Sequence, residues 1–300
     1  MTTVPRIALG CGNFGGIGSA PELFGRGESE EEAFAIMDAA WTADIRWFDT
    51  ADAYGGGRSE RTIGRWIEAT GNRPRLTTKT YNPMDAGHDH GLSRDRILRQ
   101  LASSLERLGA DRVDLYLAHE FDPEAPLAET LGTFEELVDQ GAVAAYGLSN
   151  FSAPQIEEAL EHGRPELVQN SYSLLERRDE ADVLPLCAEH GLDYQAFSPL
   201  AGGWLTGKYR RGEPHPPGSR MTLRPDPYLH LDDGRVYRGL DLLSEKGDSA
   251  AWALAWVLAH PQVTGVVIGP RRPEHLQPAL AALELDMSPG ERDEIASFFA

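Results

Sequence analysis

Cysteine, lysine and long apolar runs are all scarce in this sequence of 300 residues. The two cysteines, Cys11 and Cys187, are too few for a disulfide framework or a thiolate metal cluster. Cys11 is expected to be a small buried thiol. No apolar stretch reaches the roughly 18 residues that a membrane-spanning helix needs. The first ten residues lack the basic and apolar regions of a signal peptide. We therefore expect a protein of the reducing cytoplasm.

Positive charge is also in short supply. Lys and Arg total 28 against 47 Asp and Glu, which gives a net charge of −19. Nucleic acids and anionic membranes require a basic face, so neither is expected as a partner. A small molecule is the expected partner, and no large apolar stripe specifies an oligomeric state. Lysine occurs only at positions 79, 208 and 246. Because arginine is the default cation here, a lysine that ends a strand suggests a need for a compact ammonium with an adjustable pKa.

Short apolar runs alternate with longer amphipathic ones along the chain. The short runs predict strands at 6–10, 45–50, 75–80, 113–119, 143–149, 167–171, 192–198 and 264–269. The amphipathic runs predict helices at about 30–43, 58–69, 93–108, 127–140, 153–161, 180–189, 249–259 and 273–283. This alternation implies right-handed βαβ units and a parallel sheet. Eight units within a single domain of residues 1–300 favour an α/β fold of the closed (β/α)8 TIM-barrel type. An open doubly wound sheet is the alternative, although no G-x-G-x-x-G follows the first strand.

One segment interrupts the alternation. Residues 209–235 are rich in proline, glycine and charge, and are too long for a simple connection in a compact barrel. We expect the long loop after strand seven, at about 200–235, to cover a bound cofactor, and we name it the lid loop. A disordered surface segment is the alternative.

Four polar residues of different chemistry stand at or just after the ends of three successive strands: Asp49, Tyr54, Lys79 and His119. The C-terminal ends of TIM-barrel strands meet at one mouth, where active sites lie. A free phenol, with a pKa near 10, holds its proton too firmly for easy donation at neutral pH. An adjacent ammonium, itself oriented by a carboxylate, is expected to lower the pKa of Tyr54. The imidazole can then hydrogen bond to a substrate oxygen.

Other interpretations of these residues remain open. Asp49 alone would suit a helix cap or a turn. A metal-dependent hydrolase could use Asp49 and His119, but no carboxylate cluster accompanies them. No side chain is an obvious hydride source, so a reductase of this kind needs a cofactor.

Several segments together resemble the aldo-keto reductases over nearly the full length. They are FDTADAYGGGRSE, TTKT, VDLYLAH, the GLSN of 147–150, the QNSYS of 169–173, the AFSPLAGGWLTGKY of 196–209 and the VVIG of 266–269. SPLAGGWLTGKY and the later GSR resemble the branch that contains aflatoxin-aldehyde reductases and potassium-channel β-subunits. The resemblance implies that Tyr54 is the general acid, that Lys79 and Asp49 adjust its pKa, and that His119 orients the carbonyl.

The same resemblance implies a nicotinamide cofactor, NADPH, with NADH as the alternative. Ser149, Asn150 and Gln169 match positions that hold the nicotinamide carboxamide. Phe197 matches the aromatic residue on which the nicotinamide ring stacks, although it would also suit a core position in its strand. The matched positions that contact the pyrophosphate or cover the dinucleotide are Ser198, Leu200, Gly203, Lys208 and Arg220. Arg220 would equally suit a solvated loop.

The C-terminal cofactor segment departs from the branch. After VVIG, which ends at Gly269, the branch has Ser, then Gln four residues later, then Glu-Asn. Here those positions hold Arg271, His275, Pro278 and Ala279. Arg271 and Arg272 carry guanidinium groups that suit a 2′-phosphate, which favours NADPH, while Arg272 would equally suit the surface. Adenine binding is expected to be weaker or differently built.

Aromatic residues in the loops near the mouth are the candidates for a substrate pocket. They are Phe14, Phe24 and Trp204, with Met221, Tyr228 and Tyr237 in the same group of loops. Such a lining suits a moderately apolar aldehyde or ketone, or the face of a sugar. The predicted function is NADPH-dependent reduction of an aldehyde or ketone. The alternatives are an NAD(P)-dependent sugar or alcohol dehydrogenase that runs in the oxidative direction, and a nicotinamide-binding redox-sensor subunit with little turnover.

Overall fold

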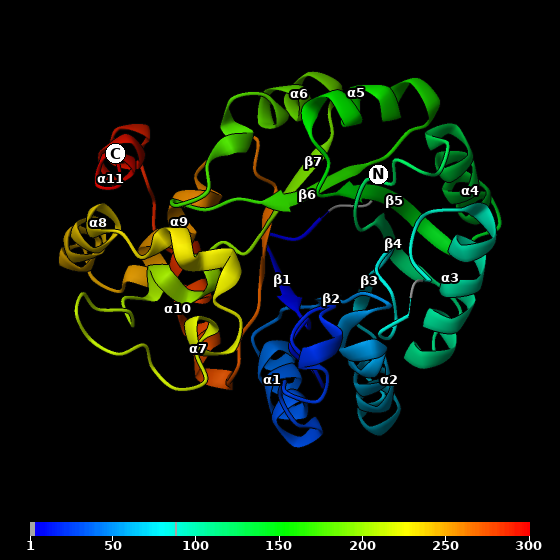
Figure 1. The fold of residues 1–300 in the computed structure, drawn as a ribbon, viewed down its shortest axis with the longest axis horizontal. Helices are drawn as coiled ribbons and strands as arrows, with labels where there is room; N and C mark the ends of the chain where they lie inside the picture. Colours follow the sequence, from blue (N-terminus) through cyan, green and yellow to red (C-terminus); the bar gives the residue numbers. More distant parts are fainter. Residues whose placement is uncertain (1–3, 88) are drawn as a thin grey trace.

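The computed structural model describes residues 4–87 and 89–300, and in these residues eight parallel strands close into a barrel in chain order. The strands are β1 Ile7–Gly10, β2 Trp47–Asp49, β3 Arg75–Thr80, β4 Val113–Ala118, β5 Val143–Ser149, β6 Leu167–Ser171, β7 Asp193–Phe197 and β8 Gly265–Ile268. Closure is made by β8, which pairs with β1 through Ile7 and Val266. Figure 1 shows the ring of strands inside a ring of helices. The TIM-barrel prediction is confirmed, and the open sheet is excluded.

Most of the helices follow the expected pattern. They are α1 Glu30–Thr42, α2 Arg58–Thr70, α3 Arg94–Leu108, α4 Leu127–Asp139, α5 Ala153–His162, α6 Val183–His190, α9 Ser249–Leu258 and α10 Gln277–Leu283. Local signals fix their ends: Ser29 and Glu32 form a capping box at the start of α1. Gly109, with φ 62°, ends α3 in the left-handed conformation. None of the described helices is long and apolar enough to cross a membrane.

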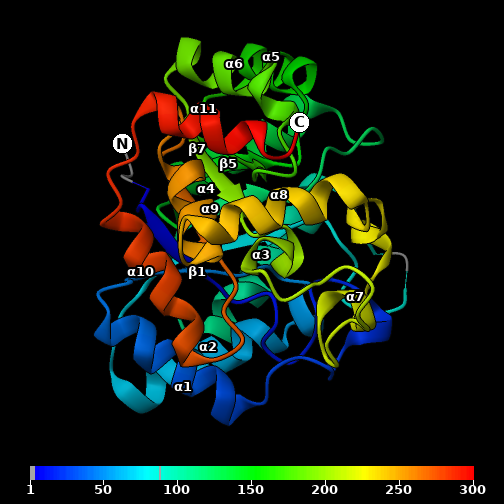
Figure 2. The same ribbon diagram turned by 90° about the vertical axis from the view of Figure 1, so that its left-hand side faces the viewer.

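Three further helices were not expected: α7 Arg220–Leu223, α8 Gly234–Glu245 and α11 Pro289–Ser297. The start of α11 did carry a signal, because Ser288 and Glu291 form a capping box. Figure 2 shows α8 and α11 on the outside of the barrel near the C-terminus, where Lys246, the residue after α8, forms an ion pair with Glu294 on α11 at 3.1 Å. These two helices pack on the outside of α9. They are additions to the eight βα units of the barrel.

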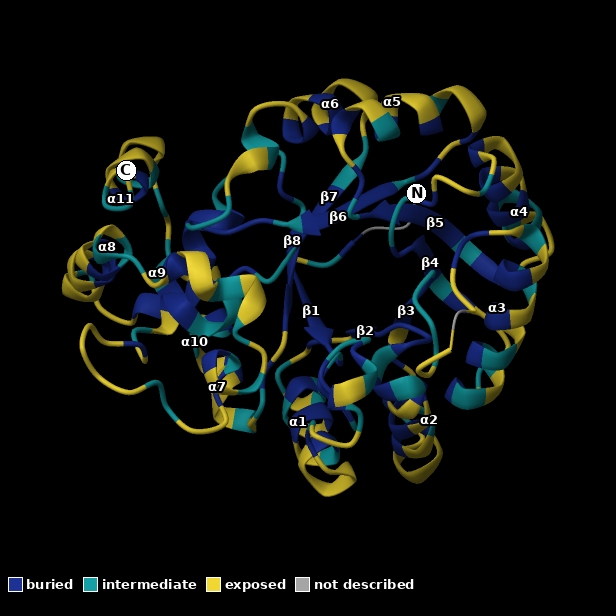
Figure 3. Cartoon of the chain, viewed as in Figure 1, coloured by how far each residue is buried: buried dark blue, intermediate teal, exposed yellow. Residues whose placement is uncertain are grey.

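The barrel has an inner and an outer apolar cluster because strand side chains alternate between two faces. Trp47 and Leu117 belong to the small cluster inside the barrel. Their neighbours Phe48 and Tyr116 belong to the large cluster between strands and helices. Figure 3 shows the matching pattern on the helices, which are buried on the side that faces the strands and exposed on the other. The alternation thus fixes which strand residues point into the barrel.

The lid loop lies between β7 and α8 and contains short helical turns, η4 Ala201–Thr206 and η5 Asp226–Leu231, on either side of α7. Two arginines fasten it to the barrel. Arg220 donates through Nη2 to Asn13 Oδ1 at 2.5 Å, and Arg271 donates through Nη1 to the carbonyl of Gly218. The lid loop is therefore tied to the loops that follow β1 and β8.

Candidate active site

The alternation of strand side chains brings three of the predicted residues to the inside of the barrel. Asp49 is two residues after Trp47, and His119 is two residues after Leu117, so both continue the inner face. Lys79 pairs in register with Leu117, which is also an inner residue. All three stand at the C-terminal ends of neighbouring strands. The barrel geometry therefore gathers an acid, an ammonium and an imidazole at one mouth.

A buried ion pair lies at the centre of this group. Lys79 Nζ donates to Asp49 Oδ1 at 2.5 Å and to the carbonyl of Thr50 at 2.9 Å. Lys79 is 1% exposed and Asp49 is 3% exposed. Burial alone lowers the pKa of Lys79, but the charges and hydrogen bonds of Asp49 and Tyr54 outweigh it, so the pKa is raised. Lys79 is therefore a charged ammonium inside the barrel.

Asp49 is held from its other side as well. Gln169 Nε2 donates to Asp49 Oδ2 at 2.9 Å and to Gln195 Oε1 at 2.8 Å. These contacts reach across the barrel interior from β6 and β7 to β2. Sequence reasoning assigned Gln169 to the cofactor and missed its contact with Asp49. It missed Gln195 altogether, although Gln195 is a polar residue two positions before Phe197 on the same face of β7.

Tyr54 is placed by a turn rather than by a strand. It is the first residue of a 3-10 turn that includes Gly55 and Gly56 and is followed by Gly57. The φ angles of these three glycines, 59°, 65° and 80°, are accessible mainly to glycine. A Cβ atom on Gly55 would also lie 2.9 Å from the carbonyl oxygen of Gly15. The tight turn brings the phenol back over the mouth. There its ring centroid lies 5.5 Å from that of His119, in an edge-on arrangement.

The pKa of Tyr54 moves in the opposite direction to the sequence-based expectation. Burial raises it, Lys79 lowers it and Asp49 raises it, and the net pKa is above the ordinary value. Lys79 Nζ lies 5.1 Å from the centre of the tyrosine ring, close enough to offset part of the burial effect. Tyr54 therefore keeps its proton at neutral pH, and Lys79 makes that proton easier to release than burial alone would allow.

His119 is neutral in this setting. Burial, together with the charge of Lys79, lowers its pKa to about 3. Asn82 Nδ2 lies 3.3 Å from His119 Nδ1. An amide nitrogen can only donate, so Nδ1 accepts and the ring proton resides on Nε2. The imidazole is therefore a hydrogen-bond donor through Nε2.

Two further hydrogen bonds hold the backbone of His119 and that of its partner Asn82. Its carbonyl accepts a hydrogen bond from Asn150 Nδ2 at 2.9 Å. Arg96, which is 2% exposed, donates through Nη2 to the carbonyl of Asn82 at 2.8 Å. Sequence reasoning missed Asn82 and Arg96. The polar residue in TKTYNP, three positions after Lys79, was the available signal for Asn82.

Replacing Asn82 with aspartate tests whether Asn82 determines which nitrogen of the His119 ring carries the proton. A carboxylate accepts a proton from Nδ1, so the neutral ring would lose the proton on Nε2. We expect Asn82→Asp to reduce kcat for carbonyl reduction by about 100-fold at pH 8. Activity should partly return at lower pH, as the ring becomes doubly protonated. The measurement is kcat against pH, with the surface variant Asn72→Asp as control. A wild-type pH profile in Asn82→Asp would mean that Asn82 does not determine the tautomer.

The residues predicted to bind a nicotinamide lie on the remaining part of the same mouth. Ser149 ends β5 and is 1% exposed, while Asn150 follows with φ 59°. Gln169 lies in β6, and Phe197 ends β7 beside the inner cluster, where it is partly exposed. Ser198 follows with φ 51°. The structure thus brings these side chains to the same rim as Asp49 and His119.

Three cations that were predicted to contact the cofactor, Lys208, Arg220 and Arg271, lie close enough to influence one another, and we name them the cation cluster. Partial burial and the charges of Arg271 and Arg220 lower the pKa of Lys208. Burial also lowers the pKa of Arg220, and Arg271 adds to this effect. Such mutual proximity is costly unless an anion offsets it. In a chain of net charge −19, the cluster fits a phosphate-bearing cofactor.

The other positions predicted to bind the cofactor lie around this cluster. Leu200 packs against the outer core, and a Cβ atom on Gly203 would lie 2.4 Å from Lys208 Nζ. Gly269 is exposed just after β8. His275 Nδ1 accepts from the backbone N–H of Arg271 at 3.3 Å, and so supports the turn that carries this arginine. Arg272 is exposed, and its Nη1 lies 3.9 Å from Glu274 Oε1.

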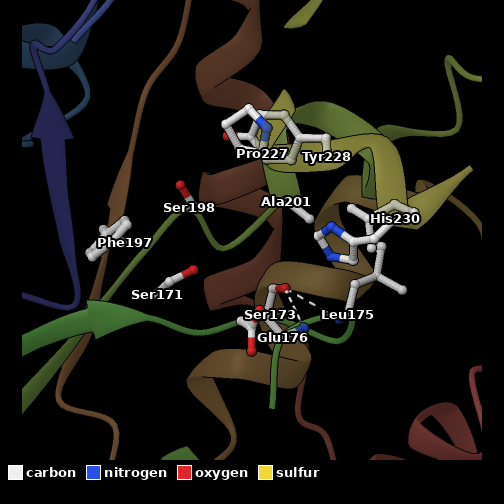
Figure 4. A pocket seen from close by; sticks show the side chains of 11 residues that line it. Ser171, Ser173, Leu175, Glu176, Phe197, Ser198, Ala201, Pro227, Tyr228 and His230 are labelled. Carbon is white, nitrogen blue, oxygen red and sulfur yellow. Dashed lines mark hydrogen bonds between the residues drawn. The ribbon is translucent and has the colours of Figure 1, made fainter. Parts of the chain in front are cut away.

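A cavity of about 180 Å³ lies between the ends of β6 and β7 and the η5 part of the lid loop. Figure 4 shows Phe197 and Ser198 on one side and Pro227, Tyr228 and His230 on the other. The turn at Gly202 allows the Tyr228 ring to pack closely against the backbone. Its φ of 64° and the nearness of that ring leave no room for a side chain at position 202. Two residues assigned to the cofactor line this cavity, so we treat it as part of the same site.

Two of the three predicted substrate residues are buried elsewhere. Phe14 is 1% exposed in the outer core, where burial of such a side chain stabilises the fold by about 1.5–3 kcal/mol. Trp204 is fully buried, and its ring centroid lies 4.7 Å from that of Tyr209. Both pack loops onto the barrel, and neither offers a surface to a substrate. Phe24 remains partly exposed beside Gly56, in the turn that carries Tyr54.

Residues 4–87 and 89–300 contain no group of three or more His, Cys, Asp or Glu side chains placed to hold a metal ion. Asp49 instead pairs with Lys79, and His119 with Asn82.

Known proteins resemble this chain over most of its length. The model of the aldo/keto reductase family matches residues 6–299. The oxidoreductase YrpG of Bacillus subtilis is 37% identical over 95% of this chain and 89% of its own length. A probable voltage-gated potassium channel subunit beta of Oryza sativa is 34% identical over 87% of this chain and 85% of its own. A solved glycerol dehydrogenase from Gluconobacter oxydans superposes with a TM-score of 0.83 at 25% identity, covering 98% of this chain and 91% of that one.

Two further relatives differ in the nucleotide that their names carry. An aldo-keto reductase of Schizosaccharomyces pombe designated for NADP(+) is 30% identical over 98% of this chain and 88% of its own. The NADH-specific methylglyoxal reductase of Escherichia coli is 29% identical over 95% of this chain and 92% of its own. Similarity at this level therefore leaves the choice of nucleotide to individual residues.

Proposed function

Because the chain belongs to the aldo/keto reductase family and is therefore an NAD(P)H-dependent oxidoreductase, we propose that it reduces an aldehyde or ketone to the alcohol. NADPH is the proposed reductant and Tyr54 the proposed general acid. The observation that carries the proposal is the buried ion pair of Lys79 and Asp49 beside a protonated phenol and a neutral imidazole. This combination can release one proton to a carbonyl oxygen at neutral pH.

Each member of the group has a distinct task. A bound nicotinamide supplies the hydride. His119 donates a hydrogen bond from Nε2 to the carbonyl oxygen and orients it. Tyr54 transfers its hydroxyl proton to the same oxygen as negative charge develops there, and the phenolate left behind is stabilised by Lys79. Asp49 keeps Lys79 charged. The carbonyl gains a hydride and a proton, and Tyr54 regains its proton from water.

The polarity of the mouth supports a small neutral carbonyl compound as the substrate. Phe24 offers apolar surface next to the turn that carries Tyr54, while Asn82 and His119 offer hydrogen-bonding groups.

We place this reaction in the cytoplasm, because Cys11 and Cys187 are both buried and free.

The cation cluster supports NADPH as the preferred nucleotide. We expect the double variant Arg271→Ala and Arg272→Ala to weaken NADPH binding at least about tenfold, since each hydrogen bond to a phosphate is charge-assisted. NADH lacks the 2′-phosphate, so its affinity should change by less than about threefold. Both dissociation constants can be obtained by titration of tryptophan fluorescence. Equal losses for the two nucleotides would mean that these arginines do not recognise the 2′-phosphate.

Turnover distinguishes the proposed reductase from a redox sensor. Binding of NADPH is measured first, and the decay of absorbance at 340 nm is then followed with 4-nitrobenzaldehyde. Binding with turnover supports the reductase. Binding without turnover across a series of aldehydes and ketones would instead favour a sensor. Absence of binding by either nucleotide would overturn the proposal.

Oxidation of an alcohol is the second candidate, and the structural likeness to a glycerol dehydrogenase favours it. The same residues serve both directions, because Tyr54 as phenolate can accept the proton that it donates in reduction. The two directions are separated by initial rates with NAD⁺ or NADP⁺ and a polyol, compared with NADPH and the corresponding aldehyde. A faster oxidative rate with NAD⁺ would favour the dehydrogenase.

A further inference from the structure

A buried carboxylate, that of Glu28, lies against the cation cluster. Glu28 is 4% exposed and stands just before α1. Its backbone is fixed to the loop after β1 by two hydrogen bonds, from Glu28 N–H to the carbonyl of Asn13 at 2.9 Å and from Gly15 N–H to the carbonyl of Glu28 at 3.1 Å. Its Oε1 accepts from Arg271 Nε at 2.5 Å. Its Oε2 is buried and has no hydrogen-bond partner among the described residues.

This placement is costly, and the helix that follows does not require it. A buried carboxylate with one unpaired oxygen loses hydration that a single ion pair only partly replaces. Burial accordingly raises the pKa of Glu28, although Arg271 opposes the shift. The start of α1 is already capped by Ser29 and Glu32. Helix capping therefore does not account for a carboxylate at position 28.

The partner of Glu28 is the arginine expected to grip a nucleotide phosphate. Arg271 uses Nε for Glu28 and Nη1 for the carbonyl of Gly218 in the lid loop. One edge of its guanidinium fork is thus occupied by a carboxylate, which reduces both the positive charge and the donors left for a second anion. Arg220 lies close enough for Glu28 to influence its pKa as well. The Glu28 carboxylate therefore reduces the positive charge that the cation cluster can offer to a second anion.

We propose that Glu28 narrows the preference of this enzyme for NADPH over NADH by partly neutralising Arg271, which lowers the affinity for a 2′-phosphate and leaves NADH almost unaffected. The inference rests on the proposed nicotinamide-dependent function. A phosphate that approaches Arg271 meets the repulsion of the Glu28 carboxylate, and such repulsion is weakly screened where side chains are buried. NADH carries a hydroxyl at this position and escapes the repulsion. The chain therefore discriminates between the two nucleotides less than its three cations would suggest.

The variant Glu28→Gln removes the charge and keeps an oxygen that can accept from Arg271 Nε. We expect the dissociation constant of NADPH to fall by about fivefold to tenfold and that of NADH to change by less than about twofold. The same contrast should appear between 2′-phospho-AMP and AMP measured by calorimetry, which requires no turnover. Glu22→Gln, an exposed residue in the same loop, is the matched control and should leave both constants unchanged.

A second variant and a double variant keep the inference falsifiable. Glu28→Asp retracts the carboxylate from Arg271 and should shift the NADPH to NADH ratio in the same direction by a smaller factor. Adding Arg271→Ala to Glu28→Gln should abolish the gain, because the charge acts through Arg271. An unchanged ratio in folded Glu28→Gln and Glu28→Asp would overturn the inference. If wild-type protein bound neither nucleotide, the proposed function would fail instead.

Discussion

Tyr54→Phe is expected to reduce kcat for carbonyl reduction by about a thousandfold or more while leaving the affinity for nicotinamide nucleotides unchanged. The substitution removes the hydroxyl and keeps the ring, so the edge-on contact with His119 survives. The hydroxyl is the group whose pKa stays above its ordinary value through burial, so it is protonated at neutral pH. General acid catalysis contributes about 10²–10⁴ in rate, and no equivalent donor replaces it. Stopped-flow measurement of a single turnover isolates this step from product release.

His119 cannot take over the proton transfer in this variant. With a pKa of about 3, only about one imidazole in ten thousand is charged at pH 7. The matched control is Tyr81→Phe, which removes the hydroxyl of a partly exposed tyrosine just after β3. We expect that variant to keep at least about half of the wild-type kcat. Retention of more than a tenth of the activity in Tyr54→Phe would remove Tyr54 from the acid role.

The positions of the four residues could be predicted because local pattern and strand alternation point the same way. Asp49 and His119 end apolar runs, and each is two residues after an inner residue of its own strand. A parallel barrel brings such ends together whatever the details of packing. The three glycines after Tyr54 are also a local feature of the sequence, and they adopt the positive φ angles of a tight turn. The framework of the site is thus encoded by short-range signals.

The pKa of Tyr54 could not be predicted in the same way, because its direction depends on a balance between two large effects. The sequence indicated the nearby ammonium, Lys79, but not how deeply the phenol would be buried. Burial is the largest effect and raises the pKa, while Lys79 lowers it. The residue types in a sequence indicate in which direction each effect shifts the pKa of Tyr54, but not which effect is larger.

Contacts between distant segments were also beyond sequence reasoning. Phe14 and Trp204 were expected at the mouth because they are aromatic residues in the loops near it, yet both are buried in the core. Asn82 and Glu28 lie in loops of low regularity, and their partners His119 and Arg271 are 37 and 243 residues away in the chain. Nothing local specifies such pairs. The contacts that position His119 and Arg271 are therefore the parts of the site that could be found only from the structure.

Lys79→Met is expected to have the second large effect, with loss of both activity and stability. Methionine is close to lysine in length but leaves Asp49 buried without a cation, at 3% exposure. Breaking one partner of a buried ion pair typically costs 3–5 kcal/mol. Tyr54 would also lose the charge that eases release of its proton. We expect kcat to fall about a thousandfold and the free energy of unfolding to fall by about 3–5 kcal/mol, measured by urea denaturation.

A double variant separates these two consequences. Adding Asp49→Asn to Lys79→Met removes the unpaired carboxylate, and its amide can still be reached by Gln169, which now contacts Asp49 Oδ2 at 2.9 Å. Much of the lost stability should therefore return, because an unpaired amide is less costly to bury than a charge. Activity should stay low, since no ammonium remains beside Tyr54. Recovery of kcat together with stability would show that Lys79 supports the fold of the mouth and has no electrostatic role in catalysis.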